Sequence, residues 1–424
     1  MKLRVLAAGL LLAASPVLAQ DIGAPAWRMV DGQPIDPRPP EKSDDAPLFP
    51  EQTRAPYKKS VPFKVTVLTD KLYATWNLAF LPDGKILVTE RLPGTIRVLD
   101  KANNLSAPIK GLENLSSTKQ GIGMLDVALA PDFARSRRIV FAFFEYNGST
   151  NSNTYVGRGR LNADATAVEG AEVIFRSIPA WPSRRLGGKT GGRIVFDKQG
   201  NIIMPVGDRS DSPPWEVAQR SDQHLGKIIR ITQDGKPAPG NPWIGSADTL
   251  PEIWAFGTRS QEGMTVDPKT GKVWETEHGP RGGDELNIIE KGKNYGWPYI
   301  THGIDYPGGP IGEGKTAKDG MEQPVYYWDP IIGPSGMAFY KGNLFPAWKN
   351  SLFVCGLRGN LLTRLEIRND KVVAEEPLLT DLKTRIRDVR VGPDGAVYVL
   401  TDSGTASISA HTNPTSKLLK LTPQ

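Results

Sequence analysis

Cysteine is almost absent from this sequence. Cys355 is the single cysteine among 424 residues, so the chain cannot form an internal disulfide bond. It stands in the apolar stretch LFVCGL, where a thiol packs as a small hydrophobic side chain. We therefore expect Cys355 to be buried in a strand, and we do not expect it to act as a nucleophile.

Clusters of positive charge and long apolar runs are also missing. The net charge is +6, but no block of Lys and Arg with interleaved aromatic residues stands out, which argues against a nucleic-acid partner. The modest basic excess suits instead one anionic small molecule held at a focused site. No apolar stretch reaches the ~20 residues that a membrane-spanning helix needs, so we expect no membrane span.

The N-terminal segment MKLRVLAAGLLLAASPVLAQ has the pattern of a secretory signal peptide. Lys2 and Arg4 precede a short apolar run, and the small residue Ala19 precedes Gln20. We predict that residues 1–19 are a signal peptide and that the protein is periplasmic or secreted. Residues 20–61, rich in proline and charge and without periodicity, are predicted to be an extended arm that is partly ordered at best.

A repeated pattern fills the chain from residue 62 to residue 424. Each copy has a short alternating apolar run, a turn with Asp, Gly or Pro, and a second alternating run, which predicts an antiparallel hairpin. The six copies are NLAFLPDGKILVTERLPGTIRVLD, LDVALAPDFARSRRIVFAFFEY, GRIVFDKQGNIIMPVGDR, GMTVDPKTGKVWETEHG, GMAFYKGNLFPAWKNSLFVCGLRGNLLTRLEI and RDVRVGPDGAVYVLTDSG.

Six such units can bury their faces by stacking around an axis. We therefore predict an all-β fold, a six-bladed β-propeller, over residues 62–424. A pair of β-sandwiches, the alternative, fits six similar units less well. Few segments look helical, and a short helical turn is expected in PPWEVAQRSDQHLGK.

Arginine dominates the ends of the repeats. Loops of a propeller gather at the ends of its central channel, so residues from many blades converge there. Arg259, Arg358, Arg385 and Arg387 would together line such a mouth. These charges repel one another unless an anion lies among them, and guanidinium groups suit carboxylates. For any one arginine, a solvated loop charge remains the alternative.

Several long motifs in order resemble one family. They are LVTERLPG, QGIGMLDVALAPDF, GGRIVFDKQGNI, LGKIIRIT, PEIWAFGTR, EHGPRGGDELNII, KNYGWP, GMAFY and RIRDVRVGPDG. The chain is similar to the soluble quinoprotein sugar dehydrogenases, the glucose/sorbosone and aldose sugar dehydrogenases that use pyrroloquinoline quinone (PQQ) and calcium. The resemblance begins at about residue 65 and implies a six-bladed propeller that oxidises an aldose or a related alcohol or aldehyde. It leaves the electron acceptor open.

The resemblance also implies metal ligands in the stretch EHGPRGGDELN. The carbonyl groups of Gly279 and Pro280 would hold the calcium that clamps PQQ, since calcium binds six to eight oxygen ligands. A separate structural calcium site would consist of Glu285, Tyr295 and Asp305, with Asp284 nearby. An ordinary polar loop is the alternative.

Cofactor contacts follow from the same resemblance. Arg259, Arg385 and Arg387 would contact PQQ, which carries three carboxylates. Arg358 stands where the family often has lysine, and Gln120 matches a glutamine beside the cofactor and substrate. Ser260 stands where the family has asparagine after the cofactor arginine.

The sequence departs from the family at the catalytic base. Lys189 in KTGGR takes the place of a histidine, with Asp208 expected beside it and Arg259 close by. Lysine is a poor base at neutral pH, because its reference pKa is about 10.4. Lys189 would therefore remain an ammonium that binds an anion, form an imine, or act as a base with a lowered pKa. His278 is the histidine we would test as a substitute base.

Three interpretations remain open at this point. The first is the PQQ- and calcium-dependent dehydrogenase. The second is a related enzyme that uses calcium or Lys189 without PQQ. The third is a non-catalytic propeller that binds a ligand, and the fold alone cannot choose among them.

Overall fold

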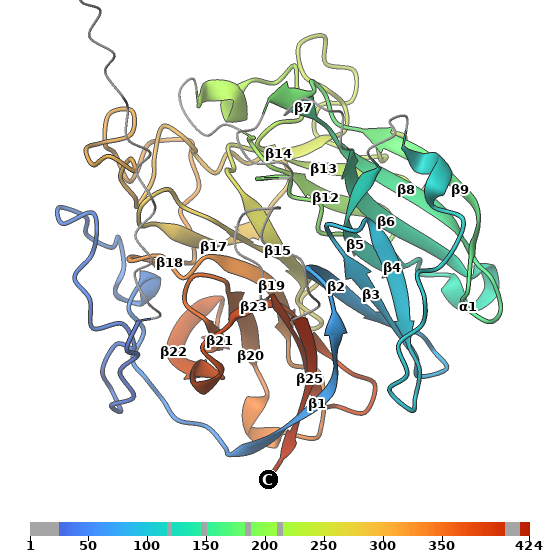
Figure 1. Ribbon diagram of the computed structural model, residues 1–424. Helices are drawn as coiled ribbons and strands as arrows, with labels where there is room; N and C mark the ends of the chain where they lie inside the picture. The colour runs from blue at the N-terminus through green and yellow to red at the C-terminus, as the bar shows by residue number, and fades with distance from the viewer. Residues whose placement is uncertain (1–24, 117–120, 146–150, 183–187, 210–214, 403–415) are drawn as a thin grey trace, which may run out of the picture.

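Six antiparallel sheets follow one another along the chain and surround a common axis (Figure 1). The computed structural model describes residues 25–116, 121–145, 151–182, 188–209, 215–402 and 416–424. Each sheet is one blade, so the predicted six-bladed β-propeller is confirmed.

The first three blades contain the following strands. Blade 1 consists of β2 (Thr75–Phe80), β3 (Ile86–Glu90) and β4 (Thr95–Leu99). Blade 2 consists of β5 (Ile122–Leu129), β6 (Arg138–Glu145), β8 (Thr154–Leu161) and β9 (Val168–Arg176). Blade 3 consists of β11 (Val195–Phe196), β12 (Ile202–Val206), β13 (Lys227–Ile231) and β14 (Ile253–Phe256), and a small separate ribbon pairs β7 (Asn151–Ser152) with β10 (Trp181–Pro182).

The second half of the ring has the same construction. Blade 4 consists of β15 (Gln261–Val266), β16 (Val273–Glu277), β17 (Asp284–Ile289) and β18 (Tyr326–Trp328). Blade 5 consists of β19 (Pro334–Phe339), β20 (Ser351–Gly356), β21 (Leu361–Arg368) and β22 (Lys371–Leu378). Blade 6 consists of β23 (Arg385–Val391), β24 (Val397–Asp402), β25 (Ser416–Pro423) and β1 (Phe63–Leu72).

Blade 6 is built from both ends of the propeller sequence. β1 pairs antiparallel with β25, with Phe63 opposite Pro423 and Leu72 opposite Ser416. The two strands lie side by side in Figure 1, blue against red. Because the first strand completes the last sheet, this pairing closes the ring and covers an edge of β25 that would otherwise be free.

The first two strands of each blade coincide with the six repeats predicted from sequence. Their turns behave as the residue types require. Gly84, between β2 and β3, has φ +87°, and Gly395, between β23 and β24, has φ +79°. Glycine reaches this region without the steric cost that a side chain would impose, so the Asp-Gly pairs fix the turns.

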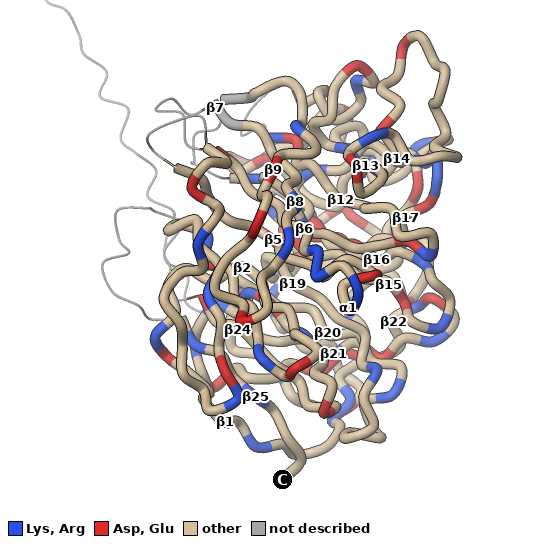
Figure 2. Tube along the Cα trace, turned by 90° about the vertical axis from the view of Figure 1, so that its right-hand side faces the viewer, with Lys and Arg blue, Asp and Glu red and all other residues tan. Residues whose placement is uncertain are grey.

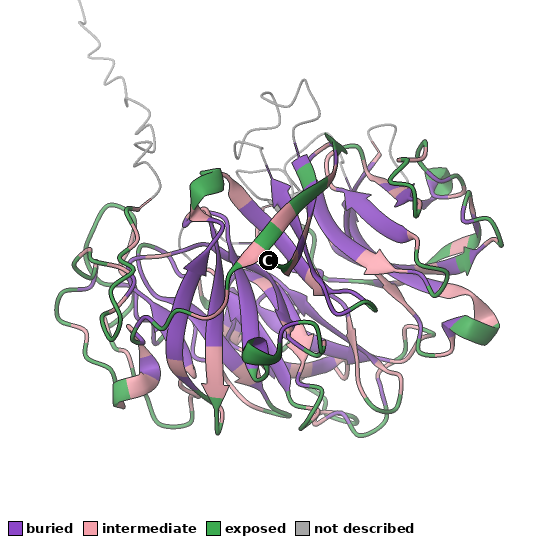
Figure 3. Cartoon of the chain, turned by 90° about the horizontal axis from the view of Figure 1, so that it is seen from below, coloured by how far each residue is buried: buried purple, intermediate pink, exposed green. Residues whose placement is uncertain are grey.

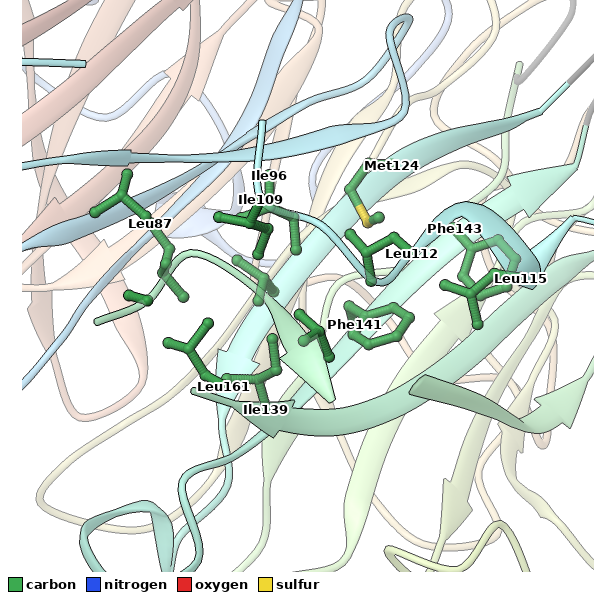
Figure 4. Packing of buried hydrophobic residues seen from close by; sticks show 14 of the residues in the cluster. Leu87, Ile96, Ile109, Leu112, Leu115, Met124, Ile139, Phe141, Phe143 and Leu161 are labelled. Atoms are coloured by element: carbon green, nitrogen blue, oxygen red, sulfur yellow. The ribbon is translucent and has the colours of Figure 1, made fainter. Parts of the chain in front are cut away.

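Apolar side chains fill the space between neighbouring blades. Between blades 1 and 2, Leu87 and Ile96 pack with Met124, Phe141 and Phe143 (Figure 4). Most strand residues are buried and the exposed residues lie mainly in loops (Figure 3). Cys355 lies on β20 with none of its surface exposed, as expected.

Helical structure is confined to short turns. One α-helix, α1 (Phe133–Ser136), and five 3-10 turns occur among the described residues. The turns are η1 (Pro50–Gln52), η2 (Glu113–Leu115), η3 (Glu216–Gln219), η4 (Pro346–Trp348) and η5 (Thr380–Leu382). The turn η3 is the helical turn predicted before β13. In the part of the chain that the structure describes, no helix is long and apolar enough to cross a membrane.

The described part of the N-terminal arm packs against the propeller. Residues 25–61 run along the outside of blades 4 and 5, where Thr53 forms a bridge to Tyr327 and Tyr57 a bridge to Glu375. Ile35 and Tyr57 are buried in the cluster that also contains the blade 4 core. Proline and charge prevented the arm from showing a periodic pattern, yet enough apolar side chains remain to attach it to the propeller.

Candidate active site

Lys189, Asp208 and Arg259 meet at one end of blade 3. Lys189 lies in the loop before β11, Asp208 follows β12, and Arg259 precedes β15. The Lys189 Nζ atom is 3.5 Å from Asp208 Oδ1, and the Asp208 amide donates to the Arg259 carbonyl at 2.8 Å. Three residues spread over about 70 positions of sequence are therefore brought together, as predicted.

The backbone at Lys189 has an uncommon conformation and packs closely against Gly207. The φ of Lys189 is +48°, an uncommon conformation for a side-chain-bearing residue. A Cβ at Gly207 would lie 2.0 Å from the Lys189 carbonyl oxygen, so this close approach requires glycine at position 207. The Lys189 side chain is 13% exposed and that of Asp208 is fully buried. An adjacent carboxylate favours the charged ammonium, which is not nucleophilic.

Trp297 contributes a contact that the sequence analysis missed. Its indole Nε1 donates to Asp208 Oδ2 at 2.9 Å, which leaves Oδ1 directed at Lys189. The guanidinium carbon of Arg259 lies 5.1 Å from the centre of the same ring. Trp297 therefore orients both the acid and the arginine of this site.

Arg259 joins this group to the predicted calcium loop. Its Nη1 donates to the carbonyl oxygens of His278 at 2.7 Å and Gly279 at 2.8 Å, and Nη2 lies 3.3 Å from the Tyr306 hydroxyl. The Nε atom is buried without a hydrogen-bond partner among the described residues. Gly279 is therefore in direct contact with a predicted cofactor-binding residue. Pro280 beside it is buried.

His278 is poorly suited to be a base. Its Nε2 lies 2.7 Å from the Pro334 carbonyl oxygen. A carbonyl only accepts, so we assign the proton to Nε2 and the lone pair to Nδ1. Burial lowers the pKa of His278 to about 4, so the neutral ring binds a proton weakly.

Both carboxylate oxygens of Asp284 accept hydrogen bonds from backbone amides. Oδ1 accepts from the Gly279 amide at 2.9 Å, and Oδ2 accepts from the amides of Ile332 and Gly333 at 2.8 and 2.7 Å. Burial raises the pKa of Asp284 to about 7, against the effect of these three donors. The carboxylate attaches the Gly279 loop to the turn that enters blade 5, and so positions the Gly279 carbonyl.

The other predicted metal ligands are only partly gathered. Glu285 and Tyr295 line one small cavity together with Gly279 and Arg259. Asp305 accepts the Tyr306 amide at 2.8 Å and is absent from this lining. Across the described ranges, no group of three Asp, Glu, His or Cys residues is arranged to hold a metal. Calcium binding by these residues therefore remains a prediction.

Blade 4 buries three carboxyl groups beside this cavity. Glu275 and Glu277 on β16 face Asn287 and Glu285 on β17 in register, and the Asn287 Nδ2 atom lies 3.3–3.4 Å from one oxygen of each acid. Burial and neighbouring carboxylates raise the pKa values of Glu275 and Glu277 well above the ordinary range. Three buried acceptors here have no hydrogen-bond partner among the described residues: Glu275 Oε1, Asn287 Oδ1 and Gln261 Oε1.

Two arginines of the predicted mouth lie beside acids that the sequence analysis did not include. Arg387 pairs with Asp402 at 2.7 Å and with Glu262 at 3.1 Å, and Arg385 Nε is 3.8 Å from Asp402. The mouth is therefore partly neutralised by the protein itself, which weakens the argument that these charges need an external anion. In Figure 2, basic residues (blue) and acidic residues (red) are interspersed along the chain.

The other predicted cofactor-binding residues make fewer side-chain contacts with the described residues. Burial lowers the pKa of Arg385 to about 10, and its Nε donor makes no hydrogen bond to the described residues. Arg358 is half-buried, and its amide donates to the Ile332 carbonyl at 2.8 Å. Ser260 is buried, and its carbonyl accepts the His278 amide at 2.9 Å. Gln120 lies outside the described residues.

Some of the missed residues carried a usable signal. Glu262 follows the Arg259 motif in RSQEGM, and Asp402 ends its repeat in LTDSG, at a position equivalent to that of other site residues. Trp297 sits in KNYGWP, one of the stretches that carried the resemblance. Its contact with Asp208 crosses 89 positions and has no local sequence signal.

Comparisons with known proteins identify the family. The family described as glucose/sorbosone dehydrogenase matches residues 72–410. An aldose sugar dehydrogenase of Escherichia coli (strain K12) is 42% identical over 345 residues, which is 81% of this chain and 91% of the relative.

Solved structures extend the comparison. The apo-form of the soluble aldose sugar dehydrogenase of Escherichia coli is 41% identical, with a TM-score of 0.76, over 86% of this chain and all of that one. The PQQ-bound form of an aldose sugar dehydrogenase from Streptomyces coelicolor is 27% identical, with a TM-score of 0.66, over 87% of this chain and 99% of that one. The chain therefore belongs to the glucose/sorbosone dehydrogenase family and is an oxidoreductase of the sugar dehydrogenase type.

Proposed function

We propose that this protein is an exported dehydrogenase that oxidises an aldose, or a related alcohol or aldehyde, with PQQ and calcium. The observation that carries the proposal is the meeting of Arg259 with the Gly279 carbonyl, beside the buried Lys189–Asp208 pair. The PQQ-bound form of the Streptomyces coelicolor relative supports the choice of cofactor. The signal peptide predicted for residues 1–19 supports export.

The residues present fit an anionic cofactor and a cation. Arg259 and Arg385 each bury an Nε donor that makes no hydrogen bond to the described residues, and such donors favour an anion. Arg358, Arg387, Ser260 and Gln120 complete the proposed contacts to PQQ. The unpartnered acceptors of blade 4 favour a cation nearby, and the carbonyls of Gly279 and Pro280 are oxygen ligands of the type that calcium prefers.

Each proposed component has a defined part. When bound, PQQ supplies the hydride acceptor and calcium supplies a Lewis acid. Arg259 holds negative charge at the mouth and fixes the Gly279 carbonyl. Lys189, as an ammonium paired with Asp208, donates a hydrogen bond to a substrate oxygen. It cannot accept the substrate proton until it has lost its own, and we therefore expect slow turnover near neutral pH.

The test is cofactor-dependent dye reduction over a panel of aldoses. We expect PQQ with calcium to give activity, and Lys189→His to raise kcat at pH 7 by about ten-fold or more, because a positioned base contributes on the order of 10²–10⁴-fold. Lys198→His, the same change on the exposed turn of blade 3, should have no effect. Absence of turnover in both the parent and Lys189→His would contradict the proposed activity.

A further inference from the structure

The N-terminal arm contacts the loop that carries the predicted calcium ligands. The arm lies outside the region that matches the family, which begins at residue 72. In Figure 1 it is the blue segment beside β18 and β22. Its bridges to Tyr327 and Glu375 attach it to the outer strands of two neighbouring blades. The part of the arm that precedes these bridges, which includes residues 41–45, lies against loops of blade 4.

Glu41 and Lys42 form the first contact. Glu41 Oε2 pairs with Arg281, which follows Pro280, at 2.7 Å. The amides of Glu41 and Lys42 donate to the two oxygens of Asp329 at 2.9 and 3.0 Å. Asp329 in turn packs closely against the loop, since a Cβ at Gly282 would lie 2.6 Å from Asp329 Oδ1.

Asp45 forms the second contact. Its Oδ2 lies 2.9 Å from His302 Nδ1, and both side chains are almost fully buried. The His302 ring stacks on Tyr327 with 3.9 Å between the ring centres. This contact fixes the segment after His302, where the Ile304 amide and carbonyl exchange hydrogen bonds with Arg281.

The loop between these contacts needs external support. Gly282 and Gly283 have φ values of +81° and +70°, and glycine loses the most conformational freedom of all residues when it is fixed. Asp284 secures one side of the loop through the Gly279 amide. The Asp329 carboxylate lies against Gly282, and the backbone of His302 lies against Gly283.

We propose that residues 41–45 of the arm clamp the loop 279–283 and hold the carbonyl groups of Gly279 and Pro280 in position to bind a cation. The clamp itself follows from the contacts above. Its consequence for calcium and PQQ rests on the proposed function. Preorganisation of this kind raises affinity because binding does not have to pay for ordering the loop.

Hydrogen exchange of the loop tests the clamp directly. The reporters are three amides: Gly279, which donates to Asp284; Arg281, which donates to Ile304; and Gly283, which donates to Trp328 at 3.0 Å. In the mature protein without added ligands, Glu41→Ala combined with Asp45→Ala should speed their exchange by about ten-fold.

A matched double variant separates the clamp from general loosening of the arm. Glu51→Ala with Lys58→Ala removes two other ion pairs of the arm, those with Lys371 and Glu366. We expect loop exchange in this control to match the parent. Equal exchange of the loop in both double variants would overturn the clamp.

Calcium and PQQ titrations of the same proteins test the consequence. The dissociation constants should rise at least ten-fold in the Glu41→Ala/Asp45→Ala variant and remain unchanged in the control. Faster loop exchange without any PQQ or calcium binding by the parent would support the clamp and contradict the proposed function. Unchanged affinity in spite of faster exchange would overturn the link between the clamp and the cation.

Discussion

Blades 1 and 2 meet through a cluster of apolar side chains (Figure 4), whereas blade 4 turns Glu275, Glu277 and Glu285 toward blade 3. The acids share their face of blade 4 with Val273 and Ile289, which pack in an ordinary apolar cluster. Two interfaces of one architecture therefore bury opposite chemistry.

The comparison distinguishes residues that stabilise the propeller from residues of the candidate active site. Apolar burial stabilises the ring wherever blades meet, and any hydrophobic residue of fitting volume serves it. Buried carboxyl groups that share one amide donor and lie beside one another lower stability, so their presence favours a ligand or a reaction that uses them. Variants of residues on either side of this contrast, and of Asp284 at the boundary between them, test it, beginning with the largest expected effect.

Phe141→Ala should have the largest effect on stability. Phe141 is fully buried in the cluster between blades 1 and 2. The loss of its ring should lower the free energy of unfolding by about 3–5 kcal/mol. Activity per folded molecule should remain that of the parent, because Phe141 makes none of the contacts described for the candidate active site. Chemical denaturation and active-site titration would measure both quantities, and a large fall in kcat would show that the scaffold and the site are not separable here.

Asp284→Ala should damage both stability and ligand binding. It leaves the amides of Gly279, Ile332 and Gly333 without an acceptor, which we expect to cost about 3 kcal/mol. The Gly279 loop should also loosen, so the affinity for calcium and PQQ should fall. Asp284→Asn, which keeps one acceptor oxygen, should lie between this variant and the parent. A full stability loss with unaltered affinity would contradict the positioning role of Asp284.

Trp297→Phe should reduce turnover more than stability. It removes the indole donor to Asp208 and keeps an aromatic face for Arg259, so we expect kcat to fall about ten-fold, in line with a lost charge-assisted hydrogen bond. Trp348→Phe is the matched control, because Trp348 is fully buried in an apolar cluster and its indole donates to Ser60. Steady-state kinetics of both variants would measure this difference. Equal losses of kcat would contradict the proposal that Trp297 positions Asp208 for turnover.

Glu275→Gln should have the smallest effect, in the opposite direction. Burial and Glu277 raise the pKa of Glu275, so the stability of the parent falls as pH rises above the ordinary value of 4.5 toward the folded-state value. The amide cannot ionise, so the variant should gain about 1 kcal/mol at pH 8 in the presence of a chelator.

A second acid provides the contrast for this variant. Glu376→Gln should instead lose stability, because Glu376 is paired with Arg364 at 2.7 Å. Denaturation curves at pH 5 and pH 8 would show whether the two changes have opposite signs. A Glu275→Gln variant that is less stable than the parent at pH 8 would contradict the loss of stability that we attribute to the buried acids of blade 4.

The fold was readable from sequence because its information is local and repeated. Alternating apolar residues and turns such as Asp83–Gly84 and Asp394–Gly395 mark each hairpin, and six similar copies leave few arrangements. Closure of blade 6 by β1 was not predicted, since the pairing joins residues that are more than 300 positions apart. The bridges of the arm to Tyr327 and Glu375 were not predicted either, because they also join distant parts of the chain.

The site was predictable where it follows motifs and not where it depends on contacts. Lys189, Asp208 and Arg259 were expected to meet and do meet. The pairing of Arg387 with Asp402 and Glu262 could not be read from separate stretches of chain. The role of Asp284 likewise depends on amides from blade 5. Whether the predicted cofactor and metal residues bind their ligands stays a prediction.

Thermal unfolding of the mature protein with PQQ and calcium together tests the central claim most directly. A ligand that binds only the native state raises the free energy of unfolding, and with it the melting temperature. The increase in free energy is about 2.7 kcal/mol when the free ligand concentration is one hundred times the dissociation constant. We predict a clear increase with both ligands, a smaller one with either alone, and none in Arg259→Ala. An unchanged melting temperature with saturating PQQ and calcium would contradict the account.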